Sequence, residues 1–165
     1  MTGRHLEYII RELPATHDAL RLVAALHHEV LPSRPHASED SRAKFLDELV
    51  DGLNGREHLA LAAFTEEDQP VAYKLGYLTG NRHERFYSWL GGVHPFHRRK
   101  GLARALLRAQ HEWARERGIR TIETQARGDN PGMLILNLQE GFQALGSIYA
   151  VDQPGVRIIL RKPLQ

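Results

Sequence analysis

The 165-residue sequence contains no cysteine, which excludes disulfide bridges, thiolate metal ligands and a cysteine nucleophile. A strong net charge is also missing, because 22 Lys and Arg residues stand against 20 Asp and Glu residues and leave +2 at pH 7. This balance argues against a dedicated nucleic-acid-binding protein. Any electropositive function must therefore be local.

Long hydrophobic runs are absent as well. No segment is long and apolar enough to span a bilayer, and the opening MTGRHLEYIIREL has no apolar core followed by a cleavage site. We therefore expect a cytoplasmic protein without a membrane partner. The sequence has no internal repeat, low-complexity tract or linker, so we expect one domain over residues 1–165.

Hydrophobic periodicity and turn residues predict an alternating order of strands and helices. Strands are expected over residues 6–13, 58–64, 70–78, 85–93, 119–126, 142–151 and 156–162. Helices are expected after the caps Thr16 and Ser38, from about Lys100 to Gly118, and over residues 130–141. The long helix between two strands predicts a parallel, right-handed crossover in an otherwise antiparallel sheet. The fold class is therefore mixed α/β.

A basic block stands between a predicted strand and the long helix, in the segment VHPFHRRKGLARALL over residues 93–107. Within it, Arg98-x-x-Gly101-x-Ala103 is placed where a loop leads into a helix N-terminus, which attracts anions. Glycine at this point lets phosphate oxygens approach the backbone closely. The pattern predicts a phosphate-binding loop, and the plainer alternative is a solvated basic first turn.

The longer segment FYSWLGGVHPFHRRKGLARALL resembles the central motif of the GNAT acyltransferases (Gcn5-related N-acetyltransferases), Arg/Gln-x-x-Gly-x-Gly/Ala after the fourth strand. The segment NPGMLILNLQEGF resembles the second motif of that family, which ends in Gly-Phe, here Gly141-Phe142. The resemblance covers nearly the whole chain, and residues 86–142 carry most of it. It implies a mostly antiparallel six- to seven-stranded sheet with helices on both faces and a V-shaped splay between strands four and five.

The resemblance also implies acetyl-CoA as acyl donor, with its pyrophosphate bound by Arg98, Arg99, Lys100, Gly101, Leu102 and Ala103. The amide of Val93 would polarise the thioester carbonyl. The preceding glycines Gly91-Gly92 indicate a bulge or a close backbone approach, and packing alone is the other interpretation. No metal is expected, because His94-x-x-His97 and His27-His28 lack a third ligand at a recognisable spacing.

Direct attack of an amine on the thioester requires a proton acceptor and stabilisation of the oxyanion and the thiolate. Many GNAT enzymes carry a proton-donating tyrosine five positions before the Phe of Gly-Phe, but here that position is Asn137. An amide donates a hydrogen bond but is not a useful proton donor. Asn137 could stabilise an unprotonated thiolate, anchor the pantetheine arm or lie on the helix surface. Tyr149 is a speculative substitute, with strand packing as its other interpretation.

The remaining candidates stand at the ends of predicted elements. Asn130 would bond the pantetheine arm or cap the helix that it opens. Glu84, His83 and Tyr87 lie at or near the start of the fourth strand, where bases of the family often lie. Glu84 is the favoured base because of its charge and place.

The leading prediction is an acetyl-CoA-dependent N-acetyltransferase acting on a small-molecule amine or on a peptide or protein amine. A catalytically silent CoA-binding domain is the alternative, because the usual tyrosine is missing. A nucleic-acid-binding module using HRRK is a third, and the charge balance disfavours it. The apolar strand VRIIL, residues 156–160, predicts a homodimer.

Overall fold

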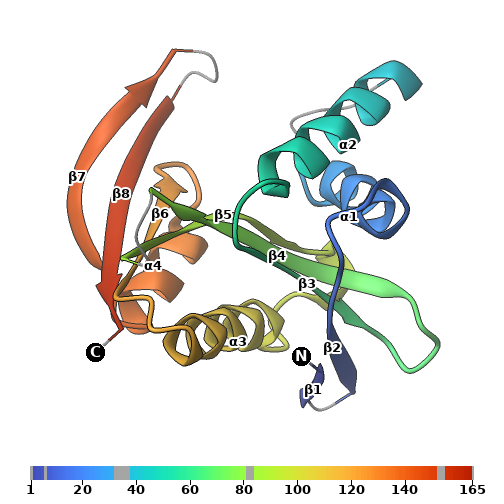
Figure 1. Ribbon diagram of the computed structural model, residues 1–165, viewed down its shortest axis with the longest axis horizontal. Coiled ribbons are helices and arrows are strands. Elements are labelled where there is room, and N and C mark those ends of the chain that lie inside the picture. Colours follow the sequence, from blue (N-terminus) through green and yellow to red (C-terminus); the bar gives the residue numbers. More distant parts are fainter. Residues whose placement is uncertain (1, 6, 32–37, 81–83, 152–154, 165) are drawn as a thin grey trace. The chain divides into compact units, whose positions relative to one another are not determined.

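The computed structural model describes residues 2–5, 7–31, 38–80, 84–151 and 155–164 (Figure 1). Its helices are α1 (His17–Val30), α2 (Glu39–Leu53), α3 (Leu102–Glu116) and α4 (Pro131–Gln139), with a short 3-10 turn, η1 (Pro95–His97). Its strands are β1 (Thr2–His5), β2 (Tyr8–Glu12), β3 (His58–Phe64), β4 (Pro70–Thr79), β5 (Arg85–Val93), β6 (Thr121–Arg127), β7 (Gln143–Ala150) and β8 (Gly155–Pro163).

The predicted capping residues form the expected hydrogen bonds at the helix ends. The Thr16 hydroxyl accepts a hydrogen bond from the amide of Ala19 at 3.3 Å and so starts α1. Ser38 starts α2 in the same way through the amide of Ser41, at 3.2 Å. After α3, Gly118 adopts a φ of 68°, a conformation that suits glycine at a helix end. The positions of these helices are thus confirmed from local signals.

Two short elements were not predicted. The strand β1 pairs antiparallel with β2 and adds one strand to the six or seven expected; its TGRH sequence has no apolar alternation that would reveal it. The turn η1 occupies part of the predicted loop, with Pro95 in its first turn. The strand expected over residues 6–13 is observed over the shorter range of β2.

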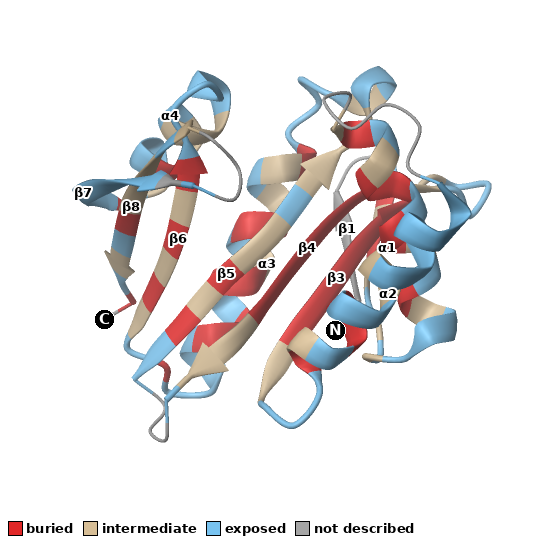
Figure 2. Cartoon of the chain, turned by 90° about the horizontal axis from the view of Figure 1, so that it is seen from above, coloured by how far each residue is buried: buried red, intermediate tan, exposed pale blue. Residues whose placement is uncertain are grey.

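The chain forms two compact units, and β4, β5 and α3 contribute to both. The first unit comprises residues 1–77 and 90–110. Its strands follow the order β1-β2-β3-β4, all antiparallel. Figure 1 shows α1 and α2 on one side of β3 and β4, and the start of α3 on the other. Because both faces are covered, β3 and much of β4 are buried (Figure 2).

The second unit comprises residues 78–89 and 111–165, with the strand order β5-β6-β8-β7. The start of β5 runs parallel to β6, and the other two pairs are antiparallel. The predicted parallel crossover through α3 is therefore confirmed. The parallel ladder pairs residues 85–87 with 121–123 and stops there, although both strands continue. This short ladder agrees with the splay that the resemblance implies.

Candidate active site

The basic loop between β5 and α3 has an unusual backbone. Arg99 has a φ of 63° and Gly101 one of 80°, and the first of these is rare for a residue with a side chain. Left-handed residues among right-handed ones turn successive amides toward one concave side, which favours anions. The helical hydrogen bonds of α3 begin at Ala105 N–H to Gly101 O, at 3.0 Å, so the amides of Leu102 and Ala103 lie in the open first turn. The loop thus combines two anion-attracting features.

Arg98 holds this loop in shape. Its Nε donates to the carbonyl of Val93 at 3.1 Å, and its Nη2 donates to the carbonyl of Val30 at the end of α1, at 3.2 Å. Two of the five guanidinium donors are therefore engaged within the first unit. The neighbouring Arg99 and Lys100 are both exposed. The loop presents its basic side chains outward while Arg98 ties it to β5 and α1.

The histidines of the loop contact residues of β2 and α1. His97 Nδ1 lies 3.0 Å from the Tyr8 hydroxyl of β2, and Lys100 Nζ lies 5.9 Å from the centre of the Tyr8 ring. Partial burial, followed by the charges of Lys100 and His94, lowers the pKa of His97 below its ordinary value. His94 Nε2 lies 3.2 Å from a carboxylate oxygen of Glu29. Both histidines thus tie the loop to neighbouring elements of the first unit.

The paired glycines of β5 mark a close backbone approach. A Cβ on Gly92 would lie 2.7 Å from Val30 Cγ1 and 2.9 Å from the Tyr73 hydroxyl, which no side chain could tolerate without movement. A Cβ on Gly91 would lie 3.0 Å from Lys74 Cδ. The expectation of a close approach is confirmed, and packing is one reason for these glycines.

The amide of Val93 points away from β4. The next amide, of His94, donates to the carbonyl of Val71 in β4 at 2.8 Å. Because successive amides of a strand point in opposite directions, the Val93 N–H faces the other side of β5. A ligand carbonyl could accept a hydrogen bond from Val93 only on this side, because the opposite side of β5 is paired with β4.

In the second unit, the two asparagines of α4 differ in their surroundings. Asn130 Oδ1 accepts a hydrogen bond from the amide of Met133 at 3.3 Å, so its capping role is confirmed. Asn137 is 3% exposed, and its Nδ2 donates to the Met133 carbonyl at 2.9 Å. Its Oδ1 is buried and has no hydrogen-bond partner. The interpretation of Asn137 as a helix-surface amide is therefore wrong, because the side chain is buried.

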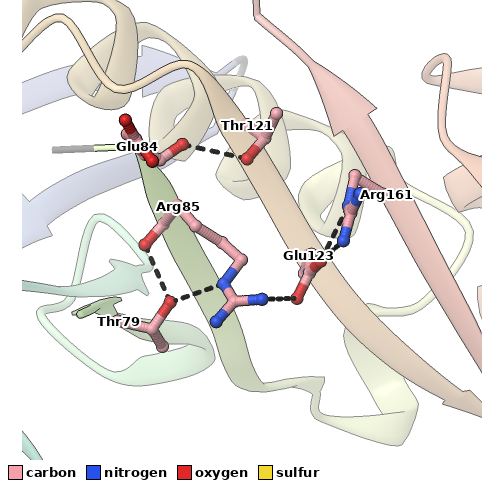
Figure 3. A network of polar contacts seen from close by, with 6 residues as sticks. All are labelled: Thr79, Glu84, Arg85, Thr121, Glu123 and Arg161. Carbon is pink, nitrogen blue, oxygen red and sulfur yellow. Dashed lines mark hydrogen bonds and ion pairs between the residues drawn. The ribbon is translucent and has the colours of Figure 1, made fainter. Parts of the chain in front are cut away.

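The candidate bases lie at the start of β5. Glu84 is exposed, and its backbone carbonyl accepts hydrogen bonds from the Thr121 amide at 3.0 Å and from the Thr121 hydroxyl at 2.9 Å. In Figure 3 the Glu84 carboxylate makes none of the drawn contacts. Tyr87 is partly buried, and His83 lies outside the described residues. Tyr149, the speculative proton donor, is 65% exposed on β7, so the packed alternative is wrong.

A carboxylate that the sequence did not single out lies close to these residues. Glu123 of β6 is 16% exposed and lies between two arginines (Figure 3). Arg161 Nε donates to it at 2.7 Å, and Arg85 Nη1 lies 3.5 Å away. Arg85 Nε also donates to the Thr79 hydroxyl at 2.9 Å. The carboxylate joins side chains of β5, β6 and β8, so the network is structural.

The sequence analysis also did not identify Lys74 of β4 as a candidate functional residue. It is 7% exposed, and burial lowers its pKa to about 8. The available signal was a lysine in the centre of the apolar strand PVAYKLGYL, where a charge is rarely buried without a partner.

The first unit brings Val93 together with the loop of residues 98–103, while Glu84, Tyr87, Asn130 and Asn137 belong to the second. In the described ranges no three or more His, Asp and Glu side chains are arranged to hold a metal ion. No helix within those ranges is long and apolar enough to cross a membrane.

The mixed α/β fold carries a basic loop with left-handed residues between strand β5 and helix α3. A family profile described as an acetyltransferase (GNAT) domain matches residues 3–131. The chain belongs to the GNAT family of acetyltransferases, and its class of enzyme is N-acetyltransferase.

Solved structures share the fold. A ribosomal-protein alanine N-acetyltransferase from Escherichia coli is 24% identical over 96% of this chain and 94% of that chain, with a TM-score of 0.70. A spermidine N-acetyltransferase chimera from Vibrio cholerae and hSSAT is 14% identical over 96% of each chain, with a TM-score of 0.75. The PaiA N-acetyltransferase from Thermoplasma acidophilum in complex with coenzyme A is 17% identical over 94% of this chain and 98% of that chain, with a TM-score of 0.69. The comparison with curated proteins found no significant match.

Proposed function

We propose that the protein transfers the acetyl group of acetyl-CoA to a primary amine by direct attack in a ternary complex, within one domain over residues 1–165. The backbone of the loop at residues 98–103 carries this proposal. Left-handed conformations at Arg99 and Gly101, followed by the open first turn of α3, provide amides suited to a pyrophosphate.

The coenzyme pyrophosphate is assigned to the loop of the first unit. Arg99 and Lys100 are exposed at the loop and add charge for the phosphates. Arg98 shapes the loop through Val93 and Val30. The Val93 amide polarises the thioester carbonyl, as the family resemblance implies.

On α4, Asn137 is assigned to the pantetheine arm. Its buried Oδ1 is an acceptor without a donor, and leaving a buried acceptor unpaired costs roughly 1–3 kcal/mol. A pantetheine amide N–H is a donor that would satisfy it. Because the unpaired atom is an acceptor, and Nδ2 already donates one hydrogen bond to the Met133 carbonyl, we assign Asn137 to anchoring the coenzyme. Asn130 supports the same helix as its cap.

The proton of the attacking amine goes to Glu84, directly or through water, and Tyr87 contacts the acceptor. The exposed Glu84 carboxylate is able to exchange protons with solvent. The acceptor is a small-molecule amine or a peptide or protein amine, the two kinds named for the spermidine and ribosomal-protein enzymes that share the fold.

Thermal melting with CoA and thiol release with an amine panel test this function. Ligand at about 100 times its dissociation constant should stabilise the fold by about 2.7 kcal/mol. Gly101→Val should abolish the CoA shift, because valine is strained at a φ of 80°. Gly55→Val is the matched control, since Gly55 has a φ of 74° in open space after α2.

Two results would contradict the proposal. An equal loss of the CoA shift in both glycine variants would show that the loop is not the binding site. CoA binding without thiol release for a polyamine, amino acids, an aminoglycoside and an alanyl peptide would favour a silent CoA-binding domain.

We also propose a homodimer through the β7–β8 edge. The strand β7 is the last of its sheet order, and the exposed apolar side chains of this hairpin are Leu145, Ile148, Tyr149, Val151 and Val156. An edge strand with exposed apolar residues favours association. A monomeric mass by light scattering over a wide concentration range would exclude it.

A further inference from the structure

Two buried polar side chains of β4 point to opposite faces of the sheet. The Tyr73 hydroxyl lies 2.5 Å from His27 Nδ1, so Tyr73 faces α1. Successive side chains of a strand alternate between faces, so Lys74 faces the other side, where α3 begins (Figure 1). Tyr73 thus has a partner in α1, and Lys74 is turned away from it.

The buried residues around Lys74 are uncharged. Its neighbour in β3 is Leu61, and Glu12 of β2 follows Leu61 in the same row. Glu12 is exposed and separated from Lys74 by that leucine. The same face of β2 carries Tyr8 near the other end of the strand. The buried side chains that this part of α3 contributes are uncharged: Leu102, Leu106, Leu107 and Gln110.

Lys74 has no counter-ion among the residues that the structure describes. Within the described residues, no side chain or carbonyl forms a hydrogen bond or ion pair with its Nζ. An isolated buried ammonium is costly, because desolvation is not compensated by a partner. A ligand that accepts a hydrogen bond or a proton from Lys74 would offset this cost.

The Lys74 side chain crosses β5 at its glycine. A Cβ on Gly91 would lie 3.0 Å from Lys74 Cδ and 3.4 Å from its Nζ. The Lys74 side chain therefore occupies space that a side chain at position 91 would take up. Gly91 itself is exposed, which places the end of the lysine at the boundary of the buried region. Val93, whose amide points away from β4, follows two residues later, about 7 Å along the strand.

We infer that Lys74 donates a proton to the coenzyme A sulfur as the thioester bond breaks. This rests on the proposed function, in which Val93 binds the thioester carbonyl. The amine nitrogen forms a bond to the carbonyl carbon, the C–S bond breaks, and the sulfur takes a proton from the Lys74 ammonium. The amine loses its proton to the base, and Lys74 is reprotonated by solvent. The products are the amide and the free thiol, and the proton that the base returns to solvent balances the proton that Lys74 takes up.

The proton affinities are matched for this step. Burial lowers the pKa of Lys74 to about 8, and an ordinary cysteine-like thiol has a pKa of about 8.5. Transfer between groups of similar pKa needs little driving force. The absence of a tyrosine at position 137 is then explained, because the proton comes from β4 instead of α4.

Steady-state kinetics with acetyl-CoA and the best amine of the panel test the inference. Lys74→Met should lower kcat by about 100-fold or more, with the KM for acetyl-CoA and the CoA melting shift nearly unchanged. The wild-type kcat should fall as the pH rises above about 8, and the variant should lack this falling limb. Lys74→Arg should remain impaired, because arginine supplies charge but does not release a proton at these pH values. Lys44→Met removes an exposed lysine and is the control.

A second variant tests whether the position of the Lys74 side chain matters. Gly91→Ala would push against Lys74 Cδ and should lower kcat while Lys74 remains in the chain. A wild-type kcat and pH profile in Lys74→Met would overturn the inference, as would full activity in Lys74→Arg, which would show that charge alone suffices. Absence of CoA binding or thiol release in the wild type would instead refute the proposed function, so the two failures are distinguishable.

Discussion

The side chains of Glu123 and Lys74 are both largely buried, but they differ in whether an oppositely charged group lies beside them. Glu123, in the second unit, lies between Arg85 and Arg161. Lys74, in the first unit, is more deeply buried and has apolar neighbours. A charge with two partners stabilises the fold around it, whereas a charge without one costs stability. The difference is that Glu123 stabilises the fold through its ion pairs, whereas Lys74 lacks such a partner among the described residues.

Removing the paired charge should have the largest effect on stability. Glu123→Ala leaves Arg85 and Arg161 facing each other without a counter-ion, and we expect a loss of about 1–3 kcal/mol. Thermal unfolding should show a Tm lower by about 2–4 °C for each kcal/mol. Glu116→Ala, at an exposed end of α3, is the control. An unchanged Tm in Glu123→Ala would remove the contrast with Lys74.

Removing the unpaired charge should have the opposite sign. Lys74→Met is expected to stabilise the apo protein by about 1–2 kcal/mol at pH 7. The folded pKa of about 8 lies below the ordinary 10.5, so the unfolded chain binds more protons between these values. Wild-type stability therefore rises as the pH increases from about 8 to 10.5, and the advantage of the variant shrinks over this window. Chemical denaturation at pH 7 and pH 10 measures both, and a destabilised variant at pH 7 would contradict the interpretation.

Asn137 lies between these two cases, because one end of its amide is paired and the other is not. Asn137→Ala should weaken CoA binding by about 3- to 10-fold, the value of one neutral hydrogen bond. The rate at saturating acetyl-CoA should stay nearly unchanged. Titration calorimetry and steady-state kinetics on one variant separate these quantities. A lower kcat with unaltered affinity would return Asn137 to the role of thiolate stabiliser.

The smallest effect on stability is expected from substitution of His97, which has the Tyr8 hydroxyl as its partner. Its pKa is lowered from 6.5 in the fold, so the unfolded chain binds its proton at higher pH. Stability from this group is complete above about pH 6.5 and decreases as the pH falls toward the lower folded value. His97→Gln should flatten the Tm profile between pH 7 and pH 5. An identical slope in both proteins would show that other groups control it.

The order of elements was predictable because local chemistry specifies it. The caps Thr16 and Ser38 each bond an amide three residues ahead, and Gly118 ends α3 through its own backbone freedom. The basic loop was identifiable for the same reason, since Arg98-x-x-Gly101-x-Ala103 lies within a single turn and the first residues of a helix. Strand β1 escaped prediction because its pairing with β2 depends on hydrogen bonds and not on an apolar pattern.

The sequence alone determined the α/β order, the helix caps and the position of the basic loop, because these depend on neighbours within a few positions. Only the tertiary structure decided which polar groups find partners. Arg98 is engaged by carbonyls of α1 and β5, and Lys74 is isolated by Leu61 and Gly91, which come from other strands. Burial and pairing are properties of residues brought together across the sheet, and no local pattern in the chain encodes them.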